Sequence, residues 1–260
     1  MSLNHDRRGA GEPLVLIHGI GSQWPVWTPI LDRLASERDV ISVDLPGFGG
    51  TPQDATVPSV EGFADRLDAF FTELGLERPH VAGNSMGGGI ALELARRGVV
   101  RSATAISPIG FWTARERAFC QASLRQGRTA AKLLSPVVPA AMANRVTRTL
   151  LLAQLAGRPW RMPPADAVVA LRALVAAPAF DEALAQFSRH LFHDPQELRD
   201  LPVTVAWGER DALLIYARQA PRAARMLPRA RHVTLTGCGH VPFHDDPEQV
   251  ATVVLAGTDA

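Results

Sequence analysis

The sequence predicts an α/β protein built on a doubly wound, mostly parallel sheet. Three observations lead to this fold class. Short runs of apolar and β-branched residues recur along the 260-residue chain, segments with helical spacing fall between them, and several of the runs are almost continuously apolar. Strands of this kind are typical of parallel sheets whose two faces are covered by helices, and alternating strands and helices build such sheets.

Six apolar runs are the expected strands. They cover residues 14–17, 40–43, 80–82, 103–106, 203–206 and 232–235. Four helices are expected to pack against these strands. They cover residues 29–36, 59–74 and 86–97, together with 248–255 after Pro247, a residue type that suits the first turn of a helix.

The alternation of strands and helices stops between residues 111 and 202. This stretch is rich in Ala, Leu and Arg and contains several prolines, so we expect short helices broken by turns. We therefore predict one core domain, residues 1–110 and 203–260, interrupted by a helical cap or lid at residues 111–202. The cap has more apolar residues than short helices bury among themselves, so part of it is expected to line a pocket.

Composition and charge exclude several classes of protein. With 47% hydrophobic and 20% charged residues, the chain is typical of a globular protein, and its net charge of +1 is spread along the sequence. Nucleic acid is therefore not an expected partner. The N-terminal residues contain no apolar core of a signal peptide and no segment has the length of a membrane helix, so we expect a soluble, cytoplasmic protein without a membrane partner. Cys120 and Cys238 are expected to be free thiols.

The most specific local pattern is Gly83-Asn84-Ser85-Met86-Gly87. It follows the expected strand 80–82 and opens the expected helix 86–97. A nucleophile elbow holds a serine in such a strained turn from strand to helix, and glycines on either side allow the backbone to approach closely. The alternative is a glycine-rich turn without chemistry. We interpret Ser85 as a catalytic nucleophile.

An acid and a base follow two later strands. Asp211 lies in the turn after residues 203–206, and His240 lies directly after residues 232–235. Carboxyl ends of parallel strands meet at one edge of the sheet, where active sites are built. We therefore predict His240 as the general base and Asp211 as the residue that orients it, with Glu209 as a rival acid.

The segment His18-Gly19-Ile20-Gly21 directly follows the expected strand 14–17. Its loop can direct a backbone N–H toward the serine. Acyl transfer needs two such donors, and we expect them to be the N–H groups of Ile20 and Met86. His18 is interpreted as a structural residue that forms hydrogen bonds within its loop.

Taken together, these motifs resemble the α/β-hydrolase superfamily over nearly the whole chain, in particular the small bacterial branch of capped serine hydrolases. Ser, Asp and His also occur here in the order typical of that superfamily. The turn at residues 44–49 and the segment 242–247 resemble structural parts of the same branch. The resemblance implies an α/β-hydrolase fold. Little more than one strand fits before Leu14, so the first strand of the family is expected to be missing.

The predicted function is hydrolysis of a carboxylic ester of a small hydrophobic substrate through an acyl-enzyme on Ser85. This reaction requires no metal and no organic cofactor. A carbon–carbon bond hydrolase of aromatic ring-cleavage products is the main alternative, because the elbow resembles that group, although its members usually have Trp where this chain has Val241. Lactonase and perhydrolase activities follow. A hydrolase-fold ligand receptor is the alternative from another class.

Other residues receive structural interpretations. Aromatic and apolar residues near the expected site are candidates for the substrate pocket, namely Trp24, Phe111, Trp112 and Val241. His190 and His193 have the spacing of a metal pair but lack matching ligands, so no metal site is expected. His244, Asp245 and Asp246 are expected to cap the last helix. The sequence leaves the oligomeric state open.

Overall fold

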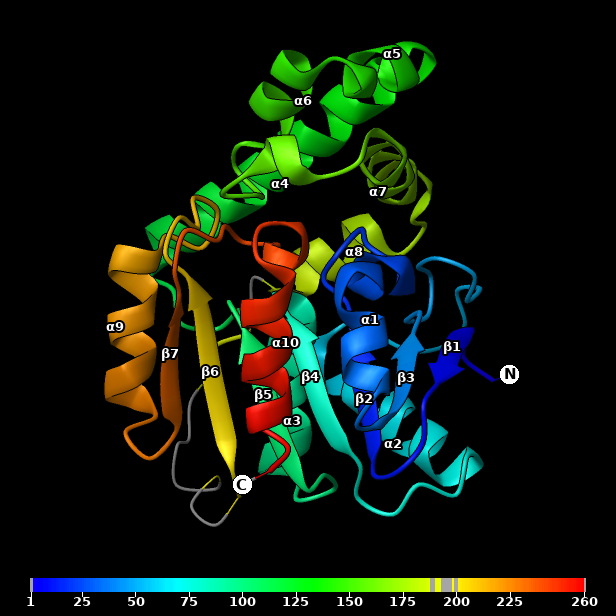
Figure 1. The fold of residues 1–260 in the computed structure, drawn as a ribbon, viewed down its shortest axis with the longest axis vertical. Helices are drawn as coiled ribbons and strands as arrows, with labels where there is room; N and C mark the ends of the chain where they lie inside the picture. Colours follow the sequence, from blue (N-terminus) through cyan, green and yellow to red (C-terminus); the bar gives the residue numbers. More distant parts are fainter. Residues whose placement is uncertain (1, 188–189, 193–197, 199–200, 260) are drawn as a thin grey trace.

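The computed structural model describes residues 2–187, 190–192, 198 and 201–259. Its centre is a seven-stranded sheet (Figure 1) with the strand order β1-β3-β2-β4-β5-β6-β7. The strands are β1 His5–Arg8, β2 Pro13–Ile17, β3 Asp39–Val43, β4 His80–Asn84, β5 Ser102–Ile106, β6 Val203–Gly208 and β7 Arg231–Leu235. Strands β2 to β7 pair in parallel, so the predicted doubly wound sheet and its six expected strands are confirmed.

The edge strand β1 precedes β2 and pairs antiparallel with β3, with His5 opposite Val43 and Arg8 opposite Val40. A single strand at this place agrees with the little room that the sequence leaves before Leu14. Its outer side chains are polar, and Arg7 forms a bidentate ion pair with Asp39 of β3 at 2.9 and 2.6 Å. Charged side chains of this kind are common on sheet edges, where they oppose pairing with other chains.

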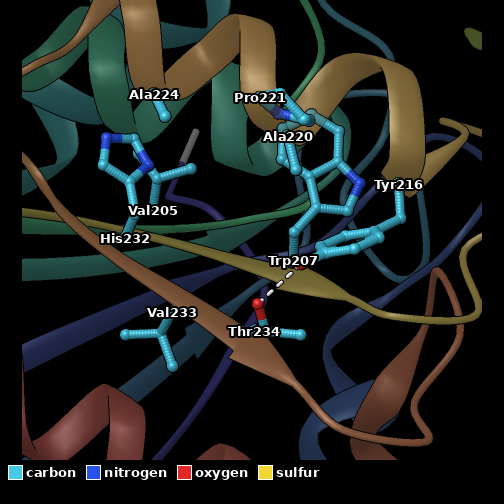
Figure 2. A pocket seen from close by; sticks show the side chains of 9 residues that line it. All are labelled: Val205, Trp207, Tyr216, Ala220, Pro221, Ala224, His232, Val233 and Thr234. Carbon is cyan, nitrogen blue, oxygen red and sulfur yellow. Dashed lines mark hydrogen bonds between the residues drawn. The ribbon is translucent and has the colours of Figure 1, made fainter.

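Helices cover both faces of the sheet. Helices α1 Thr28–Ala35 and α10 Pro247–Ala256 lie on one face, and α2 Val60–Glu73, α3 Met86–Arg96 and α9 Tyr216–Met226 lie on the other (Figure 1). Four of these helices match the expected ones. Helix α9 was not predicted, because Pro221 lies inside it and its buried residues, Gln219 and Ala223, are not large apolar side chains. Figure 2 shows that α9 packs across β6 and β7, with Ala220 and Tyr216 facing Trp207.

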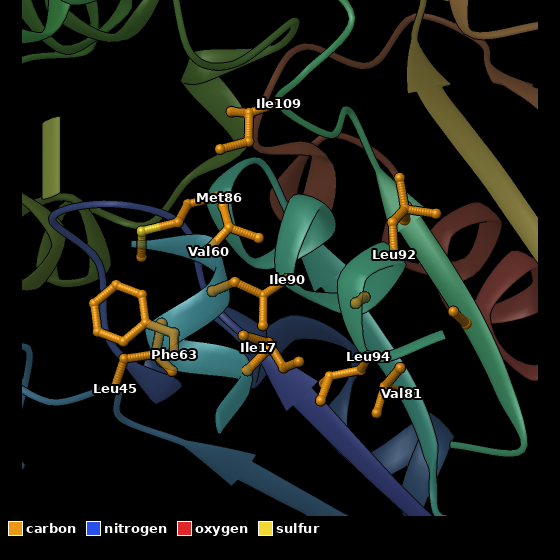
Figure 3. Packing of buried hydrophobic residues seen from close by; sticks show 14 of the residues in the cluster. Ile17, Leu45, Val60, Phe63, Val81, Met86, Ile90, Leu92, Leu94 and Ile109 are labelled. Atoms are coloured by element: carbon orange, nitrogen blue, oxygen red, sulfur yellow. The ribbon is translucent and has the colours of Figure 1, made fainter. Parts of the chain in front are cut away.

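Successive side chains of the central strand β2 enter the two cores on opposite faces of the sheet. Leu14 and Leu16 belong to the core under α1 and α10, whereas Val15 and Ile17 belong to the core under α2 and α3. Figure 3 shows Ile17 in this second core. Both faces are buried, which explains why the strands are continuously apolar rather than alternating.

Residues between β5 and β6 form most of the remaining helices. They are α4 Ala114–Leu133, η2 Ser135–Val137, α5 Val138–Ala143, α6 Arg145–Leu152, η3 Pro159–Arg161, α7 Pro164–Ala176 and α8 Phe180–Gln186. We call residues 111–202 the inserted segment. In Figure 1, α4 to α7 lie past the end of the sheet toward which β6 points. Val138, Met142, Leu152, Met162 and Ala167 form a small core of their own there. Among the described helices, none is both long enough and apolar enough to cross a bilayer.

Candidate active site

Ser85 occupies a strained turn between β4 and α3. Its φ of 58° and ψ of −113° are rare for a residue with a side chain. The turn is fixed by the Ser85 N–H, which donates to the Ile106 carbonyl at 2.9 Å. A Cβ on Gly83 would lie 2.0 Å from the carbonyl oxygen of Gly87, and one on Gly87 would lie 2.0 Å from that of Ile17. Both glycines are therefore required by close packing, as the elbow interpretation expects.

Asp211 and His240 come together at the ends of β6 and β7. His240 Nδ1 lies 2.8 Å from Asp211 Oδ2, and both side chains are almost fully buried. The other carboxylate oxygen, Oδ1, accepts hydrogen bonds from the backbone N–H groups of Leu213 and Leu214 at 2.9 and 2.8 Å. A carboxylate held in this way accepts the Nδ1–H of the ring, which leaves Nε2 of the neutral ring as a proton acceptor.

The rival acid Glu209 has a different position. Its Oε2 accepts a hydrogen bond from the backbone N–H of Gly237 at 2.8 Å. Glu209 therefore supports the loop that leads to His240, whereas the imidazole is bonded to Asp211. Asp211 remains the predicted orienting acid.

Asn84, the residue before the serine, connects the elbow to the histidine loop. Its Nδ2 donates to the backbone carbonyl of His240 at 2.9 Å and to that of Ile106 at 3.1 Å. Asn84 is buried, and it also lines the cavity described below. The sequence indicated Asn84 only as part of the elbow pattern, so its hydrogen bond to the loop of His240 was not predicted. An amide next to the nucleophile was the available signal.

The loop after β2 passes close to Ser85. A Cβ on Gly19 would lie 3.2 Å from Ser85 Cβ, and the next residue, Ile20, faces the same cavity as Ser85. His18 holds this loop in place, because its Nδ1 donates to the Gly19 carbonyl at 2.7 Å while its Nε2 accepts from the Leu45 N–H at 3.1 Å. Burial lowers the pKa of His18, so the ring is neutral and structural, as expected from the sequence.

Met86, the second expected oxyanion donor, directly follows Ser85 and is the first residue of α3. Its side chain points into the core beside Val60 and Phe63 (Figure 3). Its backbone N–H belongs to the N-terminus of α3, where such groups favour negative charge. Ile20 and Met86 remain the predicted donors.

Ser85 and His240 face one cavity of about 130 Å³. The loops at the sheet edge form one wall, and the inserted segment forms the other through Leu124, Leu152, Leu155, Ala156, Met162, Ala170, Leu171 and Leu174. Among the described residues that line it, the polar side chains are those of Ser22, Asn84, Ser85 and His240. An apolar cavity with its few polar groups near a nucleophile is typical of a small-molecule site.

The structure places the four residues expected in the substrate pocket at different positions. Val241 lines the cavity, but Trp24, Phe111 and Trp112 are not among its lining residues. Phe111 is fully buried and stacks on Phe192 with ring centroids 5.6 Å apart, and Trp112 donates its Nε1–H to the His190 carbonyl. Leucines from the inserted segment line the cavity where aromatic side chains were expected.

Trp24 lies partly buried against the core under α1 and α10. Its backbone N–H donates to Asp44 Oδ1 at 2.6 Å, and Asp44 Oδ2 accepts from the Gly50 N–H at 2.7 Å. The expected structural role of the turn at residues 44–49 agrees with these bonds. The Asp44 carboxylate joins two chain segments, and Asp44 is not among the residues that line the cavity.

Of the two histidines with the spacing of a metal pair, the structure describes only His190. His190 Nδ1 lies 3.4 Å from Glu61 Oε1, and this contact lowers the pKa of Glu61 to about 2. His193 lies outside the described residues. Within the described part of the chain, no three His, Cys, Asp or Glu side chains are grouped in a way that could hold a metal ion. Burial raises the pKa of Cys120 and Cys238 to about 12, so both thiols are protonated.

A second, more open pocket of about 190 Å³ lies between α9 and strands β6 and β7 (Figure 2). Tyr216 Oη and Thr234 Oγ1 are hydrogen-bonded there at 2.8 Å, and His232 donates from Nε2 to the Leu227 carbonyl. The Thr234 hydroxyl is thus bonded to Tyr216 and the His232 ring to a backbone carbonyl, rather than to each other. The cavity at Ser85 is therefore the better candidate for an active site.

Comparison with known proteins is consistent with this geometry. Residues 14–253 match the model of the "Alpha/beta hydrolase family". An uncharacterised protein of Mycobacterium tuberculosis is 30% identical over 264 residues, which span 95% of this chain and 75% of that protein. Two shorter matches have named activities. One is 2-hydroxymuconate semialdehyde hydrolase of Pseudomonas sp., which is 41% identical over 36% of this chain and 34% of that protein. The other is pimeloyl-[acyl-carrier protein] methyl ester esterase of Legionella pneumophila, which is 39% identical over 36% of this chain and 36% of that protein.

Proposed function

Because the chain belongs to the alpha/beta hydrolase family, we propose that it is a serine hydrolase that cleaves carboxylic esters of small hydrophobic molecules. One observation carries the proposal. His240 and Ser85 line the same apolar cavity. The His240 imidazole is bonded to the buried carboxylate of Asp211, and Ser85 lies in a strained turn. This arrangement fits the three roles that a Ser-His-Asp mechanism requires.

In the first half-reaction, Ser85 Oγ attacks the acyl carbonyl carbon while its proton moves to His240 Nε2. Asp211 stabilises the imidazolium that forms. The backbone N–H groups of Ile20 and Met86 donate to the negative oxygen of the tetrahedral intermediate. The carbon–oxygen bond to the alcohol then breaks, and His240 returns its proton to the leaving oxygen, so an acyl-enzyme and a free alcohol result.

In the second half-reaction, His240 takes a proton from water, and the resulting hydroxide attacks the acyl carbon. The bond to Ser85 Oγ breaks and the serine regains its proton from His240, which releases a carboxylic acid. All proton transfers are thus assigned to side chains of this chain.

The cavity supports a small, uncharged acyl group as substrate. Ile20, Val241 and the aliphatic side chains of the inserted segment surround it. Moving a charged group into such surroundings without a partner is unfavourable by several kcal/mol. Medium-length or hydrophobic acyl groups are therefore the proposed substrates.

Carbon–carbon bond hydrolysis is the second candidate. The observation that favours it is the match to 2-hydroxymuconate semialdehyde hydrolase, which is as strong as the match to the methyl ester esterase. Against it stands Val241 after the base, where the ring-cleavage hydrolases that the elbow resembles usually have Trp. The ester remains our first proposal.

A substrate panel separates these candidates. Short to long acyl esters, lactones and vinylogous diketones are assayed with the wild type and with Ser85→Ala. We expect repeated ester turnover that falls by about three or more decades in Ser85→Ala. Turnover of the diketones alone would establish the second candidate. A single slow cycle per protein molecule would contradict an enzyme and favour a ligand receptor.

A further inference from the structure

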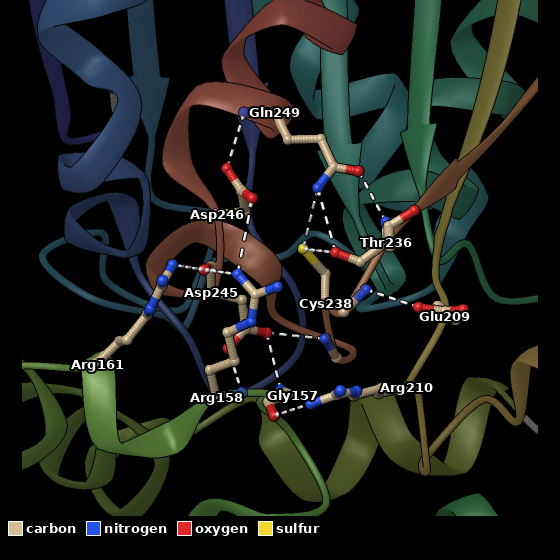
Figure 4. A network of polar contacts seen from close by, with 12 residues as sticks. Gly157, Arg158, Arg161, Glu209, Arg210, Thr236, Cys238, Asp245, Asp246 and Gln249 are labelled. Atoms are coloured by element: carbon tan, nitrogen blue, oxygen red, sulfur yellow. Dashed lines mark hydrogen bonds and ion pairs between the residues drawn. The ribbon is translucent and has the colours of Figure 1, made fainter.

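Asp245 is a buried carboxylate that joins the inserted segment to the loop carrying His240. It lies five residues after His240 and is fully buried. Its Oδ2 accepts hydrogen bonds from the backbone N–H groups of Gly157 and Gly239, both at 2.8 Å, and its Oδ1 accepts one from Arg158 at 2.6 Å. Figure 4 shows Gly157 and Arg158 against Asp245. One side chain thus bonds two segments that are distant in sequence.

The expectation from the sequence was that Asp245 caps the last helix. That role belongs to Asp246, whose side chain accepts a hydrogen bond from the Gln249 N–H at the start of α10. Asp245 points the other way, toward the inserted segment. Asp246 Oδ2 also lies 3.7 Å from Arg158 Nη1, but the backbone N–H groups of Gly157, Arg158 and Gly239 are bonded to Asp245, so Asp246 is a control for these three bonds.

Further contacts fix the same junction. The Val241 N–H donates to the Leu155 carbonyl at 2.8 Å. The guanidinium groups of Arg158 and Arg161 donate to the backbone carbonyl of Asp245 at 3.1 and 2.7 Å (Figure 4). The junction consists of backbone and side-chain bonds from both segments, so it is a rigid attachment point of the inserted segment.

At this junction the two backbones touch directly. A Cβ on Gly157 would lie 2.5 Å from the Gly237 carbonyl oxygen and 2.8 Å from the Gly239 nitrogen. A Cβ on Gly239 would lie 2.5 Å from the Gly157 nitrogen. These backbone atoms cannot move aside as flexible side chains do, so any side chain at either position separates the segments.

The residues next to these contacts belong to the cavity. Leu155 and Ala156, directly before Gly157, line its outer wall, and His240 and Val241 directly follow Gly239. We propose that Asp245 is a positioning residue that holds this wall and the base His240 in one arrangement. The proposal rests on the proposed function. Asp245 is not among the residues that line the cavity, so it acts through Gly157, Arg158 and Gly239.

Substitutions at Asp245 remove its acceptors in steps. Asparagine keeps one acceptor oxygen, which can serve Gly157 and Gly239, but its NH₂ group then faces the N–H of Arg158. Alanine removes the acceptors for all three N–H groups. Hydrogen bonds to a charged acceptor are about twice as strong as those to a neutral one, so the loss is graded from Asp to Asn to Ala. Asp246→Asn removes the same charge from the adjacent residue and keeps a good helix cap.

The test combines kinetics with hydrogen exchange. We measure kcat and KM for an acetate ester and a longer acyl ester, and amide exchange at Gly157, Arg158 and Gly239, in Asp245→Asn, Asp245→Ala and Asp246→Asn. For Asp245→Asn we expect faster exchange at these amides and a kcat about ten to a hundred times lower for both esters, since small displacements of catalytic groups have effects of this size. KM should rise for the longer ester because the wall at Leu155 moves. Asp246→Asn should stay within about twofold.

The outcomes separate this proposal from the proposed function. If Asp245→Asn has faster exchange but unchanged kcat, Asp245 has a structural role only and the proposal is overturned. A change in kcat without a change in KM for the longer ester would also overturn it. If Asp245→Ala does not fold, Asp245→Asn and Gly157→Ala provide the same readouts, with kcat and KM expected to change together. If instead Ser85→Ala keeps wild-type turnover, the proposed function fails, while the exchange rates still report whether Asp245 holds the junction.

Discussion

Shortening one leucine of the inserted segment should change which esters the enzyme prefers. Leu171 lies in α7 and lines the cavity opposite Ser85, and it is partly buried against the small core of the inserted segment. Leu171→Ala removes three carbon atoms from this wall. His240 is bonded to Asp211 and Asn84, and the Ser85 N–H to the Ile106 carbonyl, so the chemical step on a minimal acetate ester should be preserved in Leu171→Ala.

The size of the change follows from the buried apolar surface. Each methylene group of a substrate that moves from water into the cavity contributes about 0.8 kcal/mol, which corresponds to about fourfold in kcat/KM. Three carbon atoms of new space accommodate up to three more methylenes in a cavity of about 130 Å³. The ratio of kcat/KM for longer esters to that for acetate should therefore rise between about fourfold and sixtyfold.

The assay is a series of p-nitrophenyl esters from acetate to dodecanoate, with kcat/KM measured for each. Leu150→Ala is the matched control, because Leu150 carries the same side chain on α6 but is 72% exposed. The preferred chain length should move to longer acyl groups in Leu171→Ala and stay unchanged in Leu150→Ala. The reasoning would be refuted if Leu171→Ala lowered kcat/KM equally for all esters, or if both variants had the same profile.

Two further predictions concern the acid and a buried histidine. Asp211→Asn should lower kcat by about three or more decades, because no carboxylate then accepts the Nδ1–H of His240. Glu209→Gln should change kcat by less than about tenfold. If Glu209→Gln lowered kcat more than Asp211→Asn, Glu209 would be the acid. Burial lowers the pKa of His18 in the folded protein, whereas in the unfolded chain this pKa has its ordinary value near 6.5. At a pH between the two pKa values the unfolded chain therefore binds more protons than the folded protein. The free energy of unfolding then falls as the pH falls. The free energy of unfolding, measured with urea at pH 7.5 and 5.0, should therefore decrease more in the wild type than in His18→Asn, and equal decreases would contradict this role.

The sheet could be predicted from the sequence because both of its faces are covered. Burial on both sides favours continuous apolar residues, as at residues 14–17 and, apart from Thr204, at residues 203–206. Helix α9 lacks this kind of signal. Its buried residues are Gln219 and Ala223 rather than large apolar ones, and Pro221, a residue type that usually ends a helix, lies inside it.

The position of the candidate site was predictable for a similar reason. Parallel strands place their carboxyl ends at one edge, so Ser85, Asp211 and His240, each following a strand, were expected to lie together. The pocket walls were not predictable, because they depend on how the helices of the inserted segment fold back over that edge. Phe111 and Trp112 lie close in sequence to β5, yet they pack away from the cavity.

Asp245 illustrates a further limit of sequence reasoning. The sequence places it beside Asp246 and close to α10, where a helix cap is the simplest interpretation. Its partners Gly157 and Arg158 are nearly ninety residues away, and glycine at position 157 has no side chain that indicates a contact. Long-range bonds from a side chain to backbone N–H groups leave little trace in the sequence of either partner.

The central claim is that Ser85 forms an acyl-enzyme, and trapping this intermediate tests it most directly. The protein is mixed with a p-nitrophenyl ester, quenched in acid within the first turnover, digested and analysed by mass spectrometry. We predict one acyl group per chain, located on the peptide that contains Ser85, and its absence from Ser85→Ala. An acyl group on another residue, or repeated turnover of the ester by Ser85→Ala at the wild-type rate, would contradict the claim.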